Sequence, residues 1–259
     1  MTRLFDEGGA TIDFVRDDGF AAPGRVLFPA APDLAERVFD LEVGTFVIRV
    51  GETLALVDLG IGEGKHRPNR ASWHMRAGTG FLDRLGVARV AVRLVLFTHL
   101  HADHVGWATL ADGTPTFPNA RHVVSREDLA HTRAKTLAAA DPGTVGHGSY
   151  LDCVAPLERA GLLDAVAMDA EVAPGVRLVP APGHTPGQVA VRVGRAVLCA
   201  DVLHHAIQLE RPDLVSGFCA DGAAAIATRR ALLDQARAEG LVVIPSHMAP
   251  VDFGRPPVR

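Results

Sequence analysis

The residues best suited to chemistry gather in the segment THLHADH, residues 98–104, which places three histidines and one aspartate within six positions. Because alternate residues of an extended chain point to one side, His99 and His101 can bind one cation, while Asp103 and His104, after a turn, reach a second. Imidazole mixed with carboxylate favours zinc, iron or manganese over calcium. The alternative is a solvated polar loop or a set of core histidines satisfied by carbonyls, but buried imidazoles without a cation leave many polar groups to satisfy.

Short apolar strands and a few helices must position this segment. Thr45–Val50 and Thr53–Val57 are predicted to form a β-hairpin, and Arg93–Phe97 a buried strand that leads into the histidines. Further strands are predicted at His122–Ser125, Val176–Val179, Val189–Val193, Ala196–Cys199 and Leu241–Ile244, and helices near Gly80–Gly86, Arg126–Ala138, Tyr150–Ala160 and Gly222–Glu239. The last helix has Asp221 as its N-cap and Gly240 as its C-cap. Strands in two groups with helices between them indicate a layered α/β or α+β fold.

Composition narrows the class of protein. The chain has 259 residues, of which 48% are hydrophobic and 22% charged, as expected for one globular domain. A net charge of −4 with no run of Lys or Arg predicts a small-molecule partner rather than nucleic acid or a membrane. Three scattered cysteines argue against a disulfide scaffold, and an N-terminus without a signal-peptide pattern predicts a cytoplasmic protein.

Several motifs together resemble the metallo-β-lactamase superfamily. The family's H-x-H-x-D-H motif stands here as residues 99–104, and Pro182–Gly187 looks like its G-H-T-x-G turn. Asp201 matches the aspartate that bridges two metals, His247 the last ligand, and Asp58 the aspartate after the early hairpin. The resemblance implies an αββα sandwich of two mixed sheets flanked by helices. Residues 45–250 would form the catalytic core of a single domain spanning 1–259.

The same resemblance implies the ligands of two divalent ions, most simply Zn²⁺, with Mn²⁺, Fe²⁺ or Co²⁺ also accepted. One ion would be held by His99, His101 and His184 and the other by Asp103, His104 and His247, with Asp201 bridging both. Asp58, Thr98 and Thr185 would contact and orient these ligands.

Two such cations can share a hydroxide and polarise a carbonyl or phosphoryl oxygen, which is hydrolase chemistry. Asp103 is the candidate to orient the nucleophile and pass its proton to the leaving group, unless it serves only as a ligand. The carboxylate at Asp201 departs from true β-lactamases, and the imidazole at His101 departs from flavodiiron oxidoreductases.

The surroundings of Asp201 resemble the branch that contains methyl parathion hydrolase and related esterases and lactonases. N-acyl homoserine lactonases commonly carry a tyrosine at the position of His204. His204 would take over the tyrosine's role by donating a hydrogen bond to a developing oxyanion, or it would line the pocket without a catalytic role. His205 is predicted to be structural.

We therefore expect hydrolysis of lactones or carboxylic esters, including acyl homoserine lactones, with organophosphate triesters as a further class. A β-lactam hydrolase and a non-catalytic metal-binding module are the alternatives. Candidate pocket residues, each of which could instead belong to the core, are Trp107, His74, Met75, Phe218 and Met248. Residues 1–44 are predicted to form an N-terminal arm or edge segment, which could pair across a homodimer.

Overall fold

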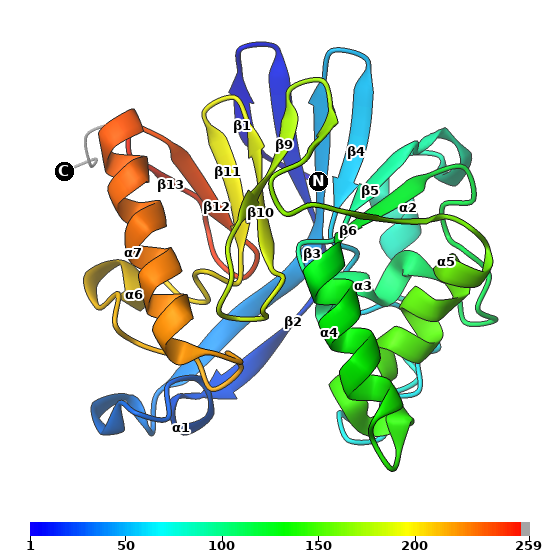
Figure 1. Ribbon diagram of the computed structural model, residues 1–259, viewed down its shortest axis with the longest axis horizontal. Helices are drawn as coiled ribbons and strands as arrows, with labels where there is room; N and C mark the ends of the chain where they lie inside the picture. The colour runs from blue at the N-terminus through cyan, green and yellow to red at the C-terminus, as the bar shows by residue number, and fades with distance from the viewer. Residues whose placement is uncertain (255–259) are drawn as a thin grey trace. The chain divides into compact units, whose positions relative to one another are not determined.

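The computed structural model describes residues 1–254, which divide into two compact units (Figure 1). Unit 1 consists of Met1–Asp18 and Val43–Ala167. Unit 2 consists of Gly19–Glu42 and the described chain from Met168 onward. Each unit is built on one mixed β-sheet, which confirms the predicted α/β class with two mixed sheets.

Unit 1 contains a seven-stranded sheet in the order β1-β2-β3-β4-β5-β6-β7. Its strands are β1 (Thr2–Glu7), β2 (Ala10–Pro23), β3 (Val38–Val50), β4 (Thr53–Val57), β5 (Leu94–Leu96), β6 (Arg121–Ser125) and β7 (Leu163–Val166), of which β2 and β3 have residues in both units. Neighbours β3 and β4 are antiparallel, as the predicted hairpin requires, while β4 to β7 run parallel. The parallel strands send their carboxyl ends to one edge of the sheet, where the histidine segment follows β5.

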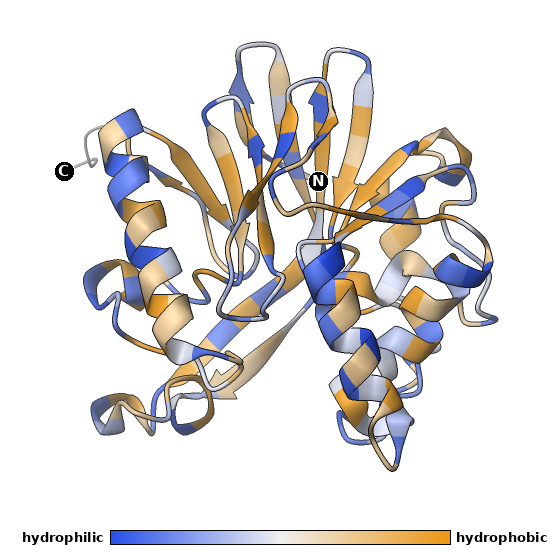
Figure 2. Cartoon of the chain, viewed as in Figure 1, coloured by the Kyte–Doolittle hydropathy of each residue, from blue (hydrophilic) through white to orange (hydrophobic). Residues whose placement is uncertain are grey.

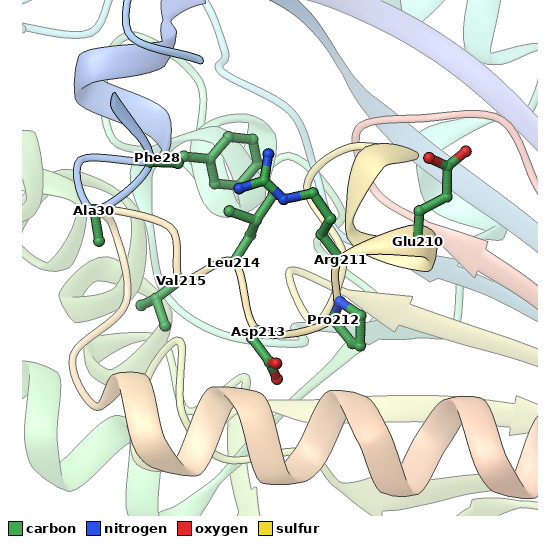
Figure 3. Close-up of a pocket in the computed structure, with 9 residues that line it drawn as sticks. Phe28, Ala30, Glu210, Arg211, Pro212, Asp213, Leu214 and Val215 are labelled. Carbon is green, nitrogen blue, oxygen red and sulfur yellow. The ribbon is translucent and has the colours of Figure 1, made fainter. Parts of the chain in front are cut away.

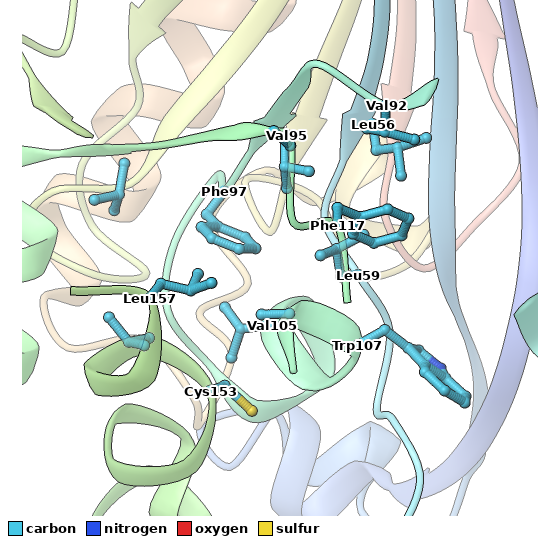
Figure 4. Packing of buried hydrophobic residues seen from close by; sticks show 14 of the residues in the cluster. Leu56, Leu59, Val92, Val95, Phe97, Val105, Trp107, Phe117, Cys153 and Leu157 are labelled. Atoms are coloured by element: carbon cyan, nitrogen blue, oxygen red, sulfur yellow. The ribbon is translucent and has the colours of Figure 1, made fainter. Parts of the chain in front are cut away.

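Helices and a continuous apolar core cover this sheet. The helices are α2 (Phe81–Leu85), η2 (Arg89–Ala91), α3 (Ala102–Val105), η3 (Gly106–Ala108), α4 (Arg126–Leu137), η4 (Pro142–Gly148), the π-helical turn η5 (Tyr150–Val154) and α5 (Ala155–Arg159). Figure 4 shows Val95 and Phe97 packed with Val105 of α3 and Leu157 of α5. Since each such side chain contributes about 1.5–3 kcal/mol when fully buried, this core fixes α3 against the sheet.

Unit 2 contains a six-stranded sheet in the order β13-β12-β11-β10-β9-β8. Its strands are β8 (Glu171–Ala173), β9 (Val176–Pro180), β10 (Val189–Val193), β11 (Ala196–Ala200), β12 (Val242–Pro245) and β13 (Val251–Asp252), and its helices are α1 (Gly24–Leu27), η1 (Pro32–Leu34), α6 (Ile207–Glu210) and α7 (Gly222–Glu239). Only β11 and β12 are parallel. Leu233 and Ala236 of α7 pack on Val197, Cys199 and Val243 of the sheet. Figure 2 shows hydrophobic residues concentrated in the strands, while α4 and α7 carry hydrophilic residues along their lengths.

The predicted helices agree with the structure to different degrees. The helix Gly222–Glu239 is confirmed at both ends: the Asp221 side chain accepts the amide of Ala224, and Gly240 has the left-handed φ of 63° that suits a C-cap glycine. The helix predicted near Tyr150–Ala160 is present, and it consists of the π-helical turn η5 followed directly by α5.

Two further observations concern the cysteines and the membrane. All three cysteines are unbridged, as predicted. Among residues 1–254 there is no helix with the length and apolar character needed to cross a lipid bilayer.

Candidate functional site

In unit 1 the loop after β5 carries the first predicted ligands and is fixed by two buried groups. The Leu100 amide donates to Asp128 Oδ2 over 2.8 Å, and Ser149 Oγ donates to the Leu100 carbonyl over 2.9 Å. Asp128 is fully buried in the first turn of α4, which Ser125 caps by accepting the Asp128 amide. The loop between β5 and α3 is therefore held on both sides of its backbone.

Asp58 organises the ligands at the end of β4. Its carboxylate accepts the Thr98 amide over 2.9 Å, the Thr98 hydroxyl over 2.8 Å and His104 Nδ1 over 2.8 Å. Asp58 adopts a φ of 53°, uncommon for any residue other than glycine, in a fully buried position. Because an ionised carboxylate only accepts hydrogen bonds, His104 carries its proton on Nδ1 and presents the Nε2 electron pair to a metal.

The same reasoning fixes the tautomer of His99. Thr98 gives its hydroxyl proton to Asp58, so its oxygen accepts from His99 Nδ1 at 3.1 Å, and Nε2 again becomes the electron-pair donor. His99 Nε2 lies 3.1 Å from His101 Nδ1, and the His99 and His104 rings are 4.0 Å apart. Asp103 Oδ2 lies 3.9 Å from His104 Nε2. Unit 1 thus brings its four predicted ligands together.

In unit 2 the carboxylate of Asp201 gathers three imidazoles. Asp201 Oδ2 lies 3.3 Å from His184 Nε2 and 3.4 Å from His204 Nε2, and Oδ1 lies 3.2 Å from His247 Nε2. All four side chains are at most 5% exposed. Asp201 follows β11 directly, after Ala200, which has a strained φ of 49°. Nitrogen and carboxylate donors at these separations fit a divalent transition metal.

Backbone and side-chain partners also orient the unit 2 imidazoles. His247 Nδ1 donates to the Glu42 carbonyl over 2.7 Å, so its Nε2 is the electron-pair donor. His184 Nδ1 lies 3.8 Å from Cys219 Sγ. Burial raises the pKa of the Cys219 thiol to about 11, so the thiol stays protonated at neutral pH.

The turn that carries His184 packs tightly on α7. Gly183 has a φ of 134°, and a Cβ added there would lie 2.3 Å from the Ala225 amide nitrogen. Thr185, predicted to support the ligands, is buried in this turn, where its carbonyl accepts the Gly183 amide over 3.0 Å. Only glycine fits at position 183, which explains why glycine precedes His184 in this turn.

His204 is buried and has its backbone fixed. Its amide donates to Gln208 Oε1 over 2.8 Å, and Gln208 Nε2 donates to the Leu214 carbonyl over 2.9 Å. Burial lowers the pKa of His204, and the nearby Asp201 carboxylate opposes that shift. The His204 ring therefore faces the Asp201 carboxylate as a neutral imidazole. His205 instead packs edge-on against Phe39 with ring centres 4.8 Å apart.

The candidate pocket residues lie in different surroundings. Trp107 is buried in the unit 1 core, stacked on Phe81 with ring centres 5.2 Å apart. His74 Nδ1 accepts the Arg67 amide over 3.0 Å. Met75 is 55% exposed, whereas Phe218 and Met248 are partly buried against apolar clusters of unit 2.

Sequence reasoning missed three residues that support the ligands: Asp128, Glu42 and Cys219. Ser125 is followed three residues later by the acidic Asp128, which is a helix-capping pattern that predicts the start of α4. The pattern does not predict that Asp128 also accepts the amide of Leu100 in a loop. Glu42 contacts His247 through its backbone carbonyl, and Cys219 contacts His184 from a position far away in the sequence. The sequence holds no signal for either contact.

Unit 2 also has a surface pocket of about 420 Å³ (Figure 3). None of the residues that line it is a predicted ligand; they are Phe28, Ala30, Ala31, Glu210, Arg211, Pro212, Asp213, Leu214 and Val215. Two of the charged side chains that line it form ion pairs, Arg211 with Asp33 over 2.6 Å and Asp213 with Arg230 over 2.5 Å.

Each unit is built on a mixed sheet and gathers histidines and an aspartate after its strand ends, which defines an α/β metal-binding protein. The sequence profile of the metallo-beta-lactamase superfamily matches residues 40–247, and the chain belongs to this superfamily.

Solved structures share the fold. A hydrolase of the beta lactamase superfamily called AbOPH superposes with a TM-score of 0.78 at 20% identity, covering 97% of this chain and 92% of that one. A probable metal-dependent hydrolase from Staphylococcus aureus gives 0.81 at 15% identity, covering 96% and 94%. AidC, a dizinc quorum-quenching lactonase in complex with its N-hexanoyl-homoserine product, gives 0.75 at 17% identity, covering 97% and 93%.

Among curated proteins, a probable metallo-hydrolase of Mycobacterium tuberculosis and one of Mycobacterium bovis are each 32% identical over 139 residues. The match covers 48% of this chain and 41% of each relative, so it spans well under half of their length.

Proposed function

We propose that this chain is a metal-dependent hydrolase of small molecules and that its substrates are lactones or carboxylic esters. In this proposal His99, His101 and His184 hold one divalent ion, Asp103, His104 and His247 hold a second, and Asp201 contacts both, with Zn²⁺ as the first metal to test. The assignment of ligands to each ion follows membership of the superfamily.

The observation that supports metal binding most directly is the fixed tautomer of three predicted ligands. His99, His104 and His247 each donate from Nδ1, to a hydroxyl, a carboxylate and a carbonyl oxygen respectively. A histidine that ligates a metal through Nε2 needs this arrangement, and a structural histidine has no reason to repeat it three times among strand-end residues.

When bound, divalent ions polarise a carbonyl oxygen and lower the pKa of water at the site. Asp103 is the proposed proton carrier, since its side chain is 12% exposed and lies beside His104. His204, neutral because burial lowers its pKa, is the proposed hydrogen-bond donor to the oxyanion that develops on the substrate.

The choice of lactones and esters is supported by the structural neighbours, which include a quorum-quenching lactonase with a homoserine product bound. Organophosphate triesters belong to the same test, because their hydrolysis needs the same polarised oxygen and activated water.

The test is metal analysis of the purified chain combined with turnover of γ-lactones, acyl homoserine lactones, aryl esters, paraoxon and nitrocefin. Asp103→Ala should lower kcat on the best substrate by about 100-fold or more. Asp112→Ala, which replaces an exposed aspartate of the same unit, is the matched control and should keep wild-type turnover.

Nitrocefin turnover equal to that of the best lactone would replace the proposal with a β-lactam hydrolase. Two bound metals with no turnover on the whole panel would exclude lactones and esters. A chain that binds no metal would refute the proposal as a whole.

A further inference from the structure

Arg229 of α7 is a fully buried arginine whose guanidinium joins two segments of unit 2. Its Nε donates to the Val202 carbonyl over 2.8 Å, and its Nη1 donates to the carbonyls of Pro212 and Leu214 over 2.7 and 2.9 Å. The N–H groups of a guanidinium form a rigid planar fork, so one side chain can hold all three carbonyls at once. Arg229 therefore ties the loop after β11 to residues 212–214, which line the pocket of Figure 3.

The partners of this cation are unusual for a buried charge. Within residues 1–254 the hydrogen bonds of Arg229 go to carbonyl oxygens, and none goes to a carboxylate. Burial lowers the pKa of Arg229, but a guanidinium remains protonated at neutral pH. A buried cation is costly compared with an apolar side chain of the same volume, so packing alone does not account for an arginine at this position.

A second buried contact fixes the far side of the same loop. The His204 amide donates to Gln208 Oε1 over 2.8 Å. Gln208 Nε2 in turn donates over 2.9 Å to the Leu214 carbonyl, the same oxygen that accepts from Arg229. The loop 201–204 is therefore held at its second and fourth residues by one hydrogen-bond network.

The residue next to Arg229 on α7 holds the other ligand segment of unit 2. The Thr228 hydroxyl donates to the Pro182 carbonyl over 2.7 Å, two residues before His184. Just before α7 begins, the Ala220 amide donates to the His184 carbonyl over 2.9 Å. One helix and its N-terminal approach therefore support both segments that carry predicted ligands in this unit.

We propose that Arg229 is a positioning residue for Asp201 and His204, which it places by fixing the loop between them through the Val202 carbonyl. This role rests on the proposed function, in which Asp201 contacts the metal ions and His204 donates to the developing oxyanion. Because a displacement of about 1 Å in a reacting or ligating group can cost about 100-fold in rate, a fixed loop at this point bears directly on turnover.

The first test measures the loop itself, with two variants of Arg229. Arg229→Lys keeps the charge but lacks the planar fork, and Arg229→Met removes the charge while keeping a long side chain. Hydrogen exchange of the full chain in EDTA, followed by mass spectrometry, should be about tenfold faster for residues 201–208 in Arg229→Lys, the size expected for loss of one charge-assisted hydrogen bond. Exchange in β10 of the same sheet should stay at the wild-type rate.

The second test measures zinc affinity and turnover of the folded protein. In competition with a chromogenic chelator, Arg229→Lys should bind zinc about tenfold more weakly than the wild type, and Arg229→Met more weakly still. On the best substrate of the panel, kcat of Arg229→Lys should fall by about 10- to 100-fold. KM should change less than about twofold, because the buried guanidinium does not touch the substrate. A role confined to stability would leave zinc affinity and kcat unchanged.

Two variants of the same helix are the matched controls. Arg230→Gln removes the neighbouring arginine, which is exposed and pairs with Asp213 over 2.5 Å. Ala236→Gly weakens α7 at a buried position that packs on the sheet. Both should keep wild-type zinc affinity and kcat, the second in spite of a lower unfolding midpoint in urea.

The outcomes separate this role from the hydrolase proposal. Unchanged zinc affinity and kcat in both Arg229 variants would overturn the positioning role and leave the hydrolase proposal intact. Faster exchange over the whole chain, instead of in residues 201–208, would also overturn it, since Arg229 would then contribute to stability alone. A wild type that binds zinc but hydrolyses nothing would overturn the hydrolase proposal, and the zinc affinities of the variants would still decide the role of Arg229. A wild type that binds no metal would overturn both.

Discussion

His122 gives a quantitative prediction for stability. It lies on β6, is fully buried and stacks on Phe97 with ring centres 6.1 Å apart. Burial lowers the pKa of this imidazole from 6.5 to about 4, while backbone groups of Ala120 and Leu162 oppose the shift. The native state therefore keeps His122 neutral, whereas the unfolded chain protonates it readily below pH 6.5.

The sign and size of the effect follow from proton linkage. Between pH 6.5 and 4 the unfolded state binds a proton that the native state excludes, so the free energy of unfolding falls as the pH falls. The contribution of His122 is fully present above pH 6.5 and is lost progressively down to pH 4. Since one pKa unit corresponds to about 1.4 kcal/mol, acidification from pH 7 to 5 should cost about 2 kcal/mol through His122 alone.

His122→Leu removes the titrating group while keeping an apolar side chain on β6. Urea unfolding of the wild type and the variant at pH 7 and pH 5, with EDTA to remove metal, gives four unfolding free energies. The wild type should lose about 2 kcal/mol more than the variant on acidification. His131→Leu, on α4 of the same unit, is the matched control and should follow the wild type. An equal loss in wild type and His122→Leu would refute the reasoning.

Two further substitutions test local contacts. Asp58→Asn should weaken metal binding by about 10- to 100-fold, measured in competition with a chromogenic chelator. The reason is that one side-chain amide cannot accept hydrogen bonds from both Thr98 and His104 as the carboxylate does. Unchanged affinity would show that Asp58 does not orient the ligands. Asp221→Ala should lower the free energy of unfolding by about 1 kcal/mol by uncapping α7, measured in urea, and a simultaneous loss of metal would contradict a purely local effect.

Structural features that depend on residues close together in the sequence could be predicted, whereas features that depend on distant contacts could not. The ends of α7 are set by Asp221 and Gly240, which act on their own helix, and both were predicted. The region Tyr150–Ala160 has a helical composition, but Pro156 near the start of α5 cannot donate a helical hydrogen bond, and a π-helical turn precedes it. β3 begins at Val38, earlier than the predicted Thr45, because its first residues have the alternating burial of a strand that the hairpin pattern did not include.

The same difference between local and distant contacts holds for the candidate site. Residues 99–104 stand together in the chain, so their chemistry could be predicted from spacing. The tautomers could not, because Asp58 and His104, or Glu42 and His247, are far apart in sequence and meet only through the fold. The edge-on contact of Trp73 with His147 likewise joins residues that are far apart in the sequence.

The anchoring of residues 61–80 has a consequence for how this protein can change over evolution. Lys65 donates to Thr109 and Arg67 pairs with Asp152, so both residues hold the segment through buried cations. Exchanging the exposed side chains of Pro68 and Asn69 therefore risks little folding stability, since the buried anchors are separate from them. Substitutions can therefore accumulate at such positions while the path of the segment is kept.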